Sequence, residues 1–162
     1  MTEQPYPSLE GIGEDRAALC IVSPAYAGRA GELNAILQYV FQAVVLGETG
    51  HAEAGRELMR IAREEMHHLE VLATLICKLG APPIYANCPL YPVGFYSAGA
   101  VDRSRELPRM LEIDLAGERM AVAQYGRMIC SLQNERVSAV LQRILLDEEE
   151  HIRILKELIS AL

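Results

Sequence analysis

The sequence lacks the paired cysteines that many small metal sites need. Its four cysteines stand at positions 20, 77, 88 and 130, and no two of them form a Cys-x-x-Cys motif. This spacing excludes a zinc ribbon and a rubredoxin-type iron site, which take their thiolates from such pairs. Cys77 and Cys130 fall within helical patterns and are expected to be buried, because free cysteine commonly packs as a small hydrophobic residue.

The sequence also has no long apolar run and no excess of positive charge. No uninterrupted hydrophobic stretch approaches the roughly 20 residues that a membrane span needs. Residues 1–15 contain neither a basic segment nor an apolar segment after it, so we expect no signal peptide and a cytoplasmic location. The formal net charge of −7 argues against nucleic acid and anionic membrane as partners.

The composition is that of an ordinary globular protein. The chain has 162 residues, of which 51% are hydrophobic and 23% are charged, and this is enough for one domain with a sizeable core. Residues 1–26 contain three prolines and little periodicity. These features predict an extended N-terminal arm with at most a short turn. The domain itself is expected over residues 27–162.

Four amphipathic segments in this domain predict an all-α fold. The first two helices are expected over residues 27–46 and 52–79, and the Gly-Glu-Thr-Gly stretch between them interrupts the pattern. Gly80 is placed to cap the second helix at its C-terminal end, and two prolines follow shortly after it. These two helices form the first predicted hairpin.

A long connection separates this hairpin from the second one. Residues 81–104 contain Pro, Gly and Tyr without a helical period, and a connection of this length permits a crossover along a bundle. The third helix is expected to begin between Asp102 and Pro108, and the fourth to follow Asn134, a favourable N-cap residue. The prediction is a four-helix bundle made of two helical hairpins joined by a long crossover connection.

The two predicted hairpins contain two copies of one motif. Residues 61–76 align with residues 144–159, and each segment contains Glu-x-x-His. On a helix, this spacing places a carboxylate and an imidazole on the same face, about one turn apart. The motif residues are Glu65 and His68 in the first copy and Glu148 and His151 in the second.

The companion helices repeat as well. The sequence GELNAILQY, residues 31–39, aligns with GERMAVAQY, residues 117–125, and the two segments share Gly, Glu, Ala, Gln and Tyr. Each hairpin therefore contributes one lone glutamate, Glu32 or Glu118, in addition to its Glu-x-x-His motif.

All four glutamates of the repeated motifs lie on helix faces that are otherwise apolar. Burying an unpaired carboxylate is costly, so four carboxylates in one core require a counter-charge. Two divalent cations carry the four positive charges that are needed, and the two histidines add neutral nitrogen ligands. The pattern predicts a dimetal site in the bundle, because a glutamate from each of two helices and Glu-x-x-His from each of the others is a known dimetal donor set. Its expected ligands are Glu32, Glu65, His68, Glu118, Glu148 and His151.

Two further acids directly precede the motif glutamates. Metal-bound imidazoles usually donate their second N–H to a carboxylate, which orients the ring. We expect Glu64 to pair with His151, and Asp147 to pair with His68, across the internal repeat. The alternative is that both acids are solvated side chains at the edges of their helices.

The remaining candidate side chains are two tyrosines and a third histidine. Tyr39 and Tyr125 lie on the inner faces, two turns beyond the lone glutamates. Three roles are open to them: hydrogen-bonding to ligand carboxylates, serving as radical-accessible phenols, or packing as ordinary core residues. His67 shares a charged helix face with Glu57 and Arg60 and is expected on the surface.

The run EEMHHLEVLATLI, residues 64–76, and the run GELNAILQYVFQ from residue 31 resemble the ferritin-like superfamily, which includes rubrerythrins, bacterioferritins and manganese catalases. They are most similar to rubrerythrin-like and manganese-catalase-like members, and the resemblance extends over roughly residues 26–162. It implies a ferritin-like bundle, the six metal ligands given above, and a bridging role for Glu65. In manganese catalases the acid corresponding to Glu148 lies outside the metal ligands, so both positions stay open for Glu148.

The resemblance implies an oxidoreductase that acts on H2O2 or O2 and has no catalytic residue beyond the metal ligands. The first expectation is a rubrerythrin-like peroxidase with two iron ions, without a rubredoxin domain, served by a separate electron-donor protein. A catalase-like enzyme with two manganese ions needs no donor, and ligand type alone does not separate the two metals. A homodimer or larger homo-oligomer is expected.

Two further classes complete the alternatives. The first is an iron-binding storage protein of bacterioferritin type, with ferroxidase activity in a hollow shell of many subunits. The second is a non-catalytic protein of coat type, whose metal ions only hold the bundle together.

Overall fold

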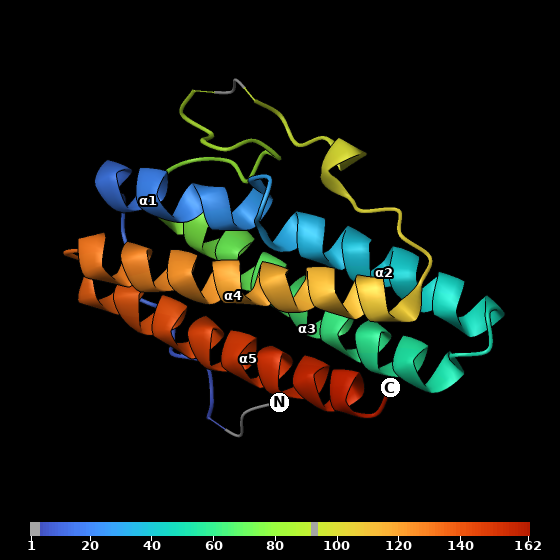
Figure 1. Cartoon of the computed structure of the whole chain (residues 1–162). Helices are drawn as coiled ribbons and strands as arrows, with labels where there is room; N and C mark the ends of the chain where they lie inside the picture. The colour runs from blue at the N-terminus through green and yellow to red at the C-terminus, as the bar shows by residue number, and fades with distance from the viewer. Residues whose placement is uncertain (1–3, 92–93) are drawn as a thin grey trace.

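The computed structural model describes residues 4–91 and 94–162 (Figure 1). The described part of the chain is all-α, and its only β-type pairing is an isolated bridge between Ala86 and Phe95. The elements in chain order are α1 (Arg16–Ala27), α2 (Glu32–Glu48), α3 (Ala52–Lys78), the short 3-10 helix η1 (Ala98–Ala100), α4 (Leu107–Ser131) and α5 (Glu135–Ser160).

The four long helices form two hairpins that pack into one bundle. Helix α2 packs along α3, and α4 packs along α5, while contacts between α3 and α5 and between α2 and α4 join the hairpins. Residues 79–91 and 94–106 of the connection lie along the outside of α1 and α2 (Figure 1). This confirms the predicted four-helix bundle with a long crossover. Within the described ranges, no helix is both long and apolar enough to cross a membrane.

The helix ends follow the expected capping residues. Gly80 has a φ of 103°, a left-handed conformation that ends α3 and that glycine adopts without steric cost. The Asn134 side chain accepts a hydrogen bond from the backbone N–H of Val137 at 3.2 Å, which caps α5. Helix α2 begins five residues later than predicted, at Glu32, because residues 28–31 form the turn that precedes it.

The N-terminal segment differs from the prediction. Residues 1–26 were expected to form an extended arm with at most a short turn, but residues 16–27 form helix α1, which packs against α2, α3 and α4. Asp15 caps this helix by accepting a hydrogen bond from the N–H of Ala18 at 3.0 Å. The sequence pattern conceals the helix, because Pro24 lies inside it and only three turns are available to show a period.

Two apolar clusters fill the two ends of the bundle. One joins α1 to the C-terminal part of α3 and the N-terminal part of α5, and it contains Leu19, Leu75 and Leu141. The other joins α2, the N-terminal part of α3, the start of α4 and the C-terminal part of α5, and it contains Leu58 and Met110. The middle of the bundle lies between these clusters and is polar.

The cysteines are placed differently from the prediction. Cys77 and Cys130 are both exposed, so the expectation that they are buried is wrong. They occupy outward-facing positions of α3 and α4, where a small residue of either polarity is tolerated. Cys20 of α1 and Cys88 of the crossover lie close together, with 3.7 Å between their sulfur atoms.

Candidate metal centre

Six acidic and imidazole side chains meet at the polar middle of the bundle. Helices α2 and α4 each contribute one glutamate, and helices α3 and α5 each contribute a glutamate and a histidine. None of the six is more than 4% exposed. The structure therefore brings together all the residues that the sequence suggested as metal ligands, namely Glu32, Glu65, His68, Glu118, Glu148 and His151.

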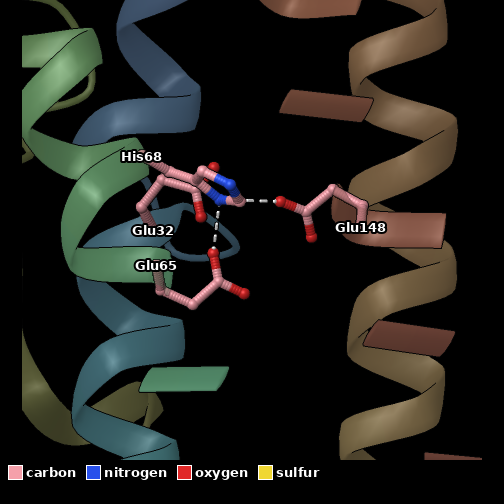
Figure 2. A group of neighbouring side chains, drawn as sticks. All are labelled: Glu32, Glu65, His68 and Glu148. Carbon is pink, nitrogen blue, oxygen red and sulfur yellow. Dashed lines mark hydrogen bonds and ion pairs between the residues drawn. The ribbon is translucent and has the colours of Figure 1, made fainter. Parts of the chain in front are cut away.

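These side chains form two overlapping groups of four. The first group adds Glu32 and His68 to a shared pair, and the second adds Glu118 and His151 to the same pair. The shared residues are Glu65 and Glu148, which face each other from α3 and α5 (Figure 2). In each group, one potential ligand atom per residue lies within 4.8 Å of all the others.

The two oxygens of each shared carboxylate face different imidazoles. Glu65 Oε2 lies 2.8 Å from Nδ1 of His68, and Glu65 Oε1 lies 3.1 Å from Nδ1 of His151. Glu148 Oε1 lies 3.1 Å from Nδ1 of His68, and Glu148 Oε2 lies 3.8 Å from Nδ1 of His151. A carboxylate that bridges two cations needs this arrangement.

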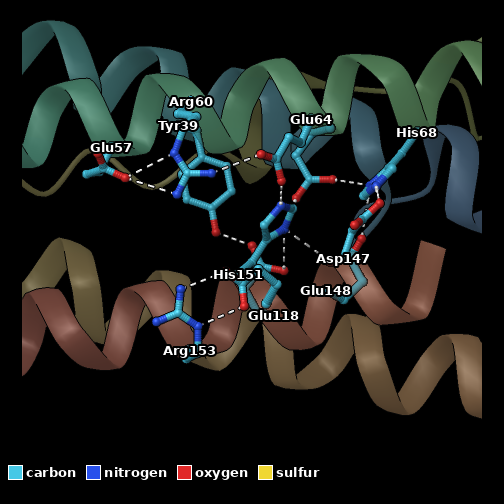
Figure 3. Close-up of polar contacts among 12 residues, drawn as sticks. Tyr39, Glu57, Arg60, Glu64, His68, Glu118, Asp147, Glu148, His151 and Arg153 are labelled. Carbon is cyan, nitrogen blue, oxygen red and sulfur yellow. Dashed lines mark hydrogen bonds and ion pairs between the residues drawn. The ribbon is translucent and has the colours of Figure 1, made fainter. Parts of the chain in front are cut away.

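The opposite nitrogen of each imidazole contacts an acid from the other hairpin (Figure 3). His68 Nε2 lies 3.3 Å from Asp147 Oδ2, and His151 Nε2 lies 2.8 Å from Glu64 Oε2. The acids in turn contact arginines: Arg143 donates to Asp147 at 2.6 Å. With Nε2 engaged in this way, Nδ1 of both rings faces the centre and is the nitrogen that can bind a cation.

The two tyrosines bond to the lone glutamates across the hairpins. Tyr39 of α2 donates its hydroxyl to Glu118 of α4, and Tyr125 of α4 donates to Glu32 of α2 (Figure 3 shows the first). Burial, followed by the charge of the neighbouring carboxylates, raises the pKa of both phenols well above its ordinary value. Both phenols therefore stay protonated and act as donors.

The polar atoms that face the centre are incompletely satisfied by the protein. Among the described residues, Glu65 Oε1, Glu148 Oε1 and His151 Nδ1 are buried and have no partner with hydrogen-bond geometry. Buried polar atoms are normally paired, and leaving one unpaired is costly. Atoms of this kind, drawn from carboxylate and imidazole, are ligands for divalent iron, manganese or zinc. The donor set fits a pair of such cations.

The lone glutamates are poor anions without a metal. Burial, and after it the charge of neighbouring carboxylates, raises the pKa of Glu32 well above its ordinary value. The same causes raise the pKa of Glu118 to about 7. Both side chains therefore tend to carry a proton in the metal-free protein.

The shared glutamates and the imidazoles behave in the opposite way. Burial acts against charge on Glu65, but the charge of His151 and the close approach of both imidazoles to its carboxylate lower its pKa to about 2. The imidazole bonds also lower the pKa of Glu148, against the effects of burial and of Glu65. Burial opposes charge on the histidines too, yet their carboxylate partners raise the pKa of His68 and of His151 well above its ordinary value. The metal-free centre therefore holds four protons, one each on Glu32, Glu118, His68 and His151. Two divalent cations would bring the same positive charge.

Residues outside the sequence prediction also contribute to the centre. Tyr6 donates its hydroxyl to Asp147 at 2.9 Å, and nothing local in the sequence signals this contact. Gln42 of α2 donates to Asp114 of α4 at 2.9 Å, in the interior beside the centre. Burial raises the pKa of Asp114 to about 8. His67, as expected, is on the surface, with its side chain 52% exposed.

A cavity of about 400 Å³ leads to the centre between α2 and α4. Small side chains on both helices, including Ala35, Gly117 and Ala121, leave room for it. Its inner wall is formed by the lone glutamates, their tyrosine partners and the shared pair. A small molecule that enters the cavity therefore meets the candidate ligands Glu32, Glu65, Glu118 and Glu148.

Comparison with known sequences shows similarity to bacterioferritins. The bacterioferritin of Desulfovibrio desulfuricans is 29% identical over 147 residues, which cover 89% of this chain and 76% of that protein. The bacterioferritin of Mycobacterium leprae is 30% identical over 128 residues, covering 77% of this chain and 74% of that protein.

Comparison with solved structures shows the same fold. The manganese catalase KatB of Anabaena superposes with a TM-score of 0.82 over 99% of this chain and 80% of its own, at 21% sequence identity. A mycobacterial bacterioferritin superposes with a TM-score of 0.74 over 90% of this chain and 84% of its own, at 26% identity. The finer resemblance to rubrerythrin-like members stays a prediction. Because the ferritin-like domain family also matches residues 29–162, the chain belongs to the ferritin-like family.

Proposed function

We propose that this protein is a dimetal-carboxylate oxidoreductase that acts on H2O2 or O2. The observation that carries the proposal is the sharing of Glu65 and Glu148 between the two ligand groups. Two shared carboxylates would keep two cations adjacent, at the end of a cavity that small molecules can enter. Two redox-active metal ions in such a site supply the two electrons that reduce an O–O bond.

The residues of the chain have separate tasks in this proposal. Glu65 and Glu148 would each help to hold both cations, while Glu32 with His68, and Glu118 with His151, would complete one position each. This assignment of Glu148 is supported by its two oxygens, which face different imidazoles. Tyr39 and Tyr125 hold the carboxylates of the lone glutamates in place. The apolar clusters at both ends of the bundle shield the centre from water along the bundle axis, and the cavity gives access from the side.

We propose iron as the metal, with manganese as the alternative. Carboxylate and imidazole ligands suit both ions. With iron, the enzyme would be a peroxidase that receives electrons from a separate donor protein. With manganese, it would disproportionate H2O2 without a donor, and the structural likeness to the manganese catalase supports the fold of such an enzyme but not its reaction.

The second candidate function is iron oxidation and storage in a shell of many subunits. It is favoured by the sequence similarity to two bacterioferritins. Gel filtration separates the candidates, because a hollow shell elutes as a far larger particle than a dimer. A shell that takes up many iron ions per chain would support storage. A dimer that holds two ions per chain would support the oxidoreductase.

The proposed activity is tested by a single turnover. Protein loaded with two Fe(II) ions per chain under anaerobic conditions is mixed with one equivalent of H2O2, and iron oxidation and peroxide consumption are followed by stopped-flow absorbance. We expect both to proceed much faster than with free Fe(II), and the Glu65→Ala variant to lose most of its metal and its activity. The Glu112→Gln variant, changed at a 64% exposed glutamate of α4, serves as the control. If the loaded protein reacts with neither H2O2 nor O2, the oxidoreductase proposal is wrong and the structural, coat-type role remains.

A further inference from the structure

The N-terminal segment reaches the metal centre from outside the bundle. Tyr6 lies ten residues before α1, and its hydroxyl donates to Asp147 Oδ2 of α5 at 2.9 Å. Asp147 Oδ2 is also the oxygen that lies 3.3 Å from Nε2 of His68. One carboxylate oxygen thus connects the N-terminal segment to a candidate metal ligand.

The position of the Tyr6 ring is fixed by further contacts. The guanidinium carbon of Arg143 lies 4.4 Å from the centre of the ring, which places the cation over its face. Arg143 also donates to the carbonyl oxygen of Gln4 at 2.5 Å and to Asp147 Oδ2 at 2.6 Å. His67 meets the ring edge-on, with 4.8 Å between the ring centres. The segment is therefore held by contacts from two helices.

The equivalent support at the other imidazole is built differently. His151 Nε2 contacts Glu64 Oε2 at 2.8 Å, and Arg60 binds the other oxygen, Oε1, at 3.0 Å. Arg60 has a 38% exposed side chain, whereas the side chain of Arg143 is 6% exposed. At Asp147, by contrast, a single oxygen is shared between Tyr6, Arg143 and His68. The internal repeat therefore supplies an acid and an arginine at each imidazole, Glu64 with Arg60 and Asp147 with Arg143, but the burial of the arginine and the contacts of the acid differ between the two.

We propose that Tyr6 is a positioning residue for the metal position at His68, acting through Asp147. The inference rests on the dimetal site of the proposed function, but not on its reaction. Fixing Asp147 Oδ2 fixes the direction from which it supports the imidazole, and so the direction of Nδ1. The two metal positions consequently bind with different affinities, and the Tyr6 hydroxyl supports the position at His68.

The test uses Co(II), which is spectroscopically visible and does not depend on turnover with peroxide. Stepwise binding constants are measured by competition with a chromophoric chelator, and the ligand-field bands of each ion are recorded. Partners of metal-bound histidines typically contribute between 10-fold and 100-fold in metal affinity. For Tyr6→Phe, which removes only the hydroxyl, we expect a loss of roughly 10-fold in one constant, with the other unchanged.

A double-mutant cycle establishes whether Tyr6 acts through Asp147. Asp147→Asn should weaken the same constant, and adding Tyr6→Phe to it should have little further effect. Tyr91→Phe is the matched control, because that side chain is 69% exposed on the crossover, and it should change neither constant. A lower melting temperature without a change in binding would assign Tyr6 a merely structural role. Equal losses in both constants, or additive effects with Asp147→Asn, would also overturn the proposal. Wild-type protein that fails to bind two ions would instead refute the dimetal site itself.

Discussion

The charges at the centre of the bundle balance at the level of single side chains. Without metal, His68 and His151 carry protons and face two ionised carboxylates, while the lone glutamates retain theirs. The group is then close to neutral. With two divalent cations bound, the four carboxylates are ionised and the two imidazoles are neutral, so the metal-bound group is neutral as well. Metal binding is therefore an exchange of cations for protons, and the low-dielectric interior is spared a net charge in both states.

The first prediction follows from this exchange. Binding of two Zn(II) ions should release close to four protons at pH 6, and fewer as the pH rises through the pKa of Glu118, which is about 7. The number is measured by isothermal titration calorimetry in buffers of different ionisation enthalpy. Metal uptake without proton release would show that the carboxylates and imidazoles are already deprotonated in the metal-free protein.

The second prediction concerns Asp114, whose pKa is raised to about 8 by burial. Because the folded state holds this proton to higher pH than the unfolded state, wild-type stability should fall as the pH rises between about 4 and 8. The slope from one such group is at most about 1.4 kcal/mol per pH unit. Asp114→Asn keeps an acceptor for the hydrogen bond from Gln42 but removes the titrating carboxyl group. The free energy of unfolding of the variant should therefore rise relative to that of wild type as the pH rises.

The measurement is urea denaturation of metal-free protein at several pH values. Glu112→Gln is a suitable control, since its side chain is 64% exposed on the same helix and its replacement should have little effect at any pH. An unchanged difference between wild type and Asp114→Asn from pH 5 to pH 8 would contradict the assignment.

At the level of elements, the approach of α2 to α3 depends on one glycine. A β-carbon on Gly55 of α3 would lie 2.8 Å from the carbonyl oxygen of Ala43 in α2, closer than real contacts allow. The opposing atom belongs to the backbone, so relief requires the two helices to separate. The spacing of this hairpin also sets the distance between Glu32 and the Glu-x-x-His motif of α3.

The third prediction compares two Gly→Ala substitutions. Gly55→Ala should destabilise the protein by about 1–3 kcal/mol, the usual cost of overpacking, despite the better helix propensity of alanine. Gly126→Ala in α4 meets nothing within 4 Å and should stabilise the protein by about 0.5–1 kcal/mol. Chemical denaturation measures both values. If the two variants change stability in the same direction, the close approach at Gly55 is not limiting.

At the level of the whole molecule, metal and stability are coupled through the buried acids and imidazoles. The fourth prediction is that the metal-free protein loses stability as the pH rises from 6 to 8. The raised pKa values of Glu32, Glu118 and the two histidines mean that the folded state binds more protons than the unfolded state in this range. Metal replaces these protons, so the metal-bound protein should be affected much less.

Differential scanning calorimetry of both forms checks this prediction. The difference in melting temperature between the metal-bound and the metal-free protein should widen from pH 6 to pH 8. A constant difference across this range would mean that the acids and imidazoles of the centre are not protonated in the folded, metal-free chain.

The sequence by itself determined the helices of the bundle, the crossover and the identity of the side chains at its centre. These features are local: a helical period, a cap such as Asn134, or a Glu-x-x-His spacing is written within a few residues. The internal repeat then related the two halves. The sequence pattern did not predict helix α1, because the segment is short and contains Pro24. Such a short helix gains its stability from packing on other helices.

Only the tertiary structure decided how these side chains face one another. Which imidazole each oxygen of Glu148 approaches depends on the packing of α3 against α5, which no local pattern encodes. Likewise, Tyr6 and Asp147 are 141 residues apart, and their contact exists because the N-terminal segment packs against α3 and α5. Local sequence selects the ligand atoms, and long-range packing sets their directions.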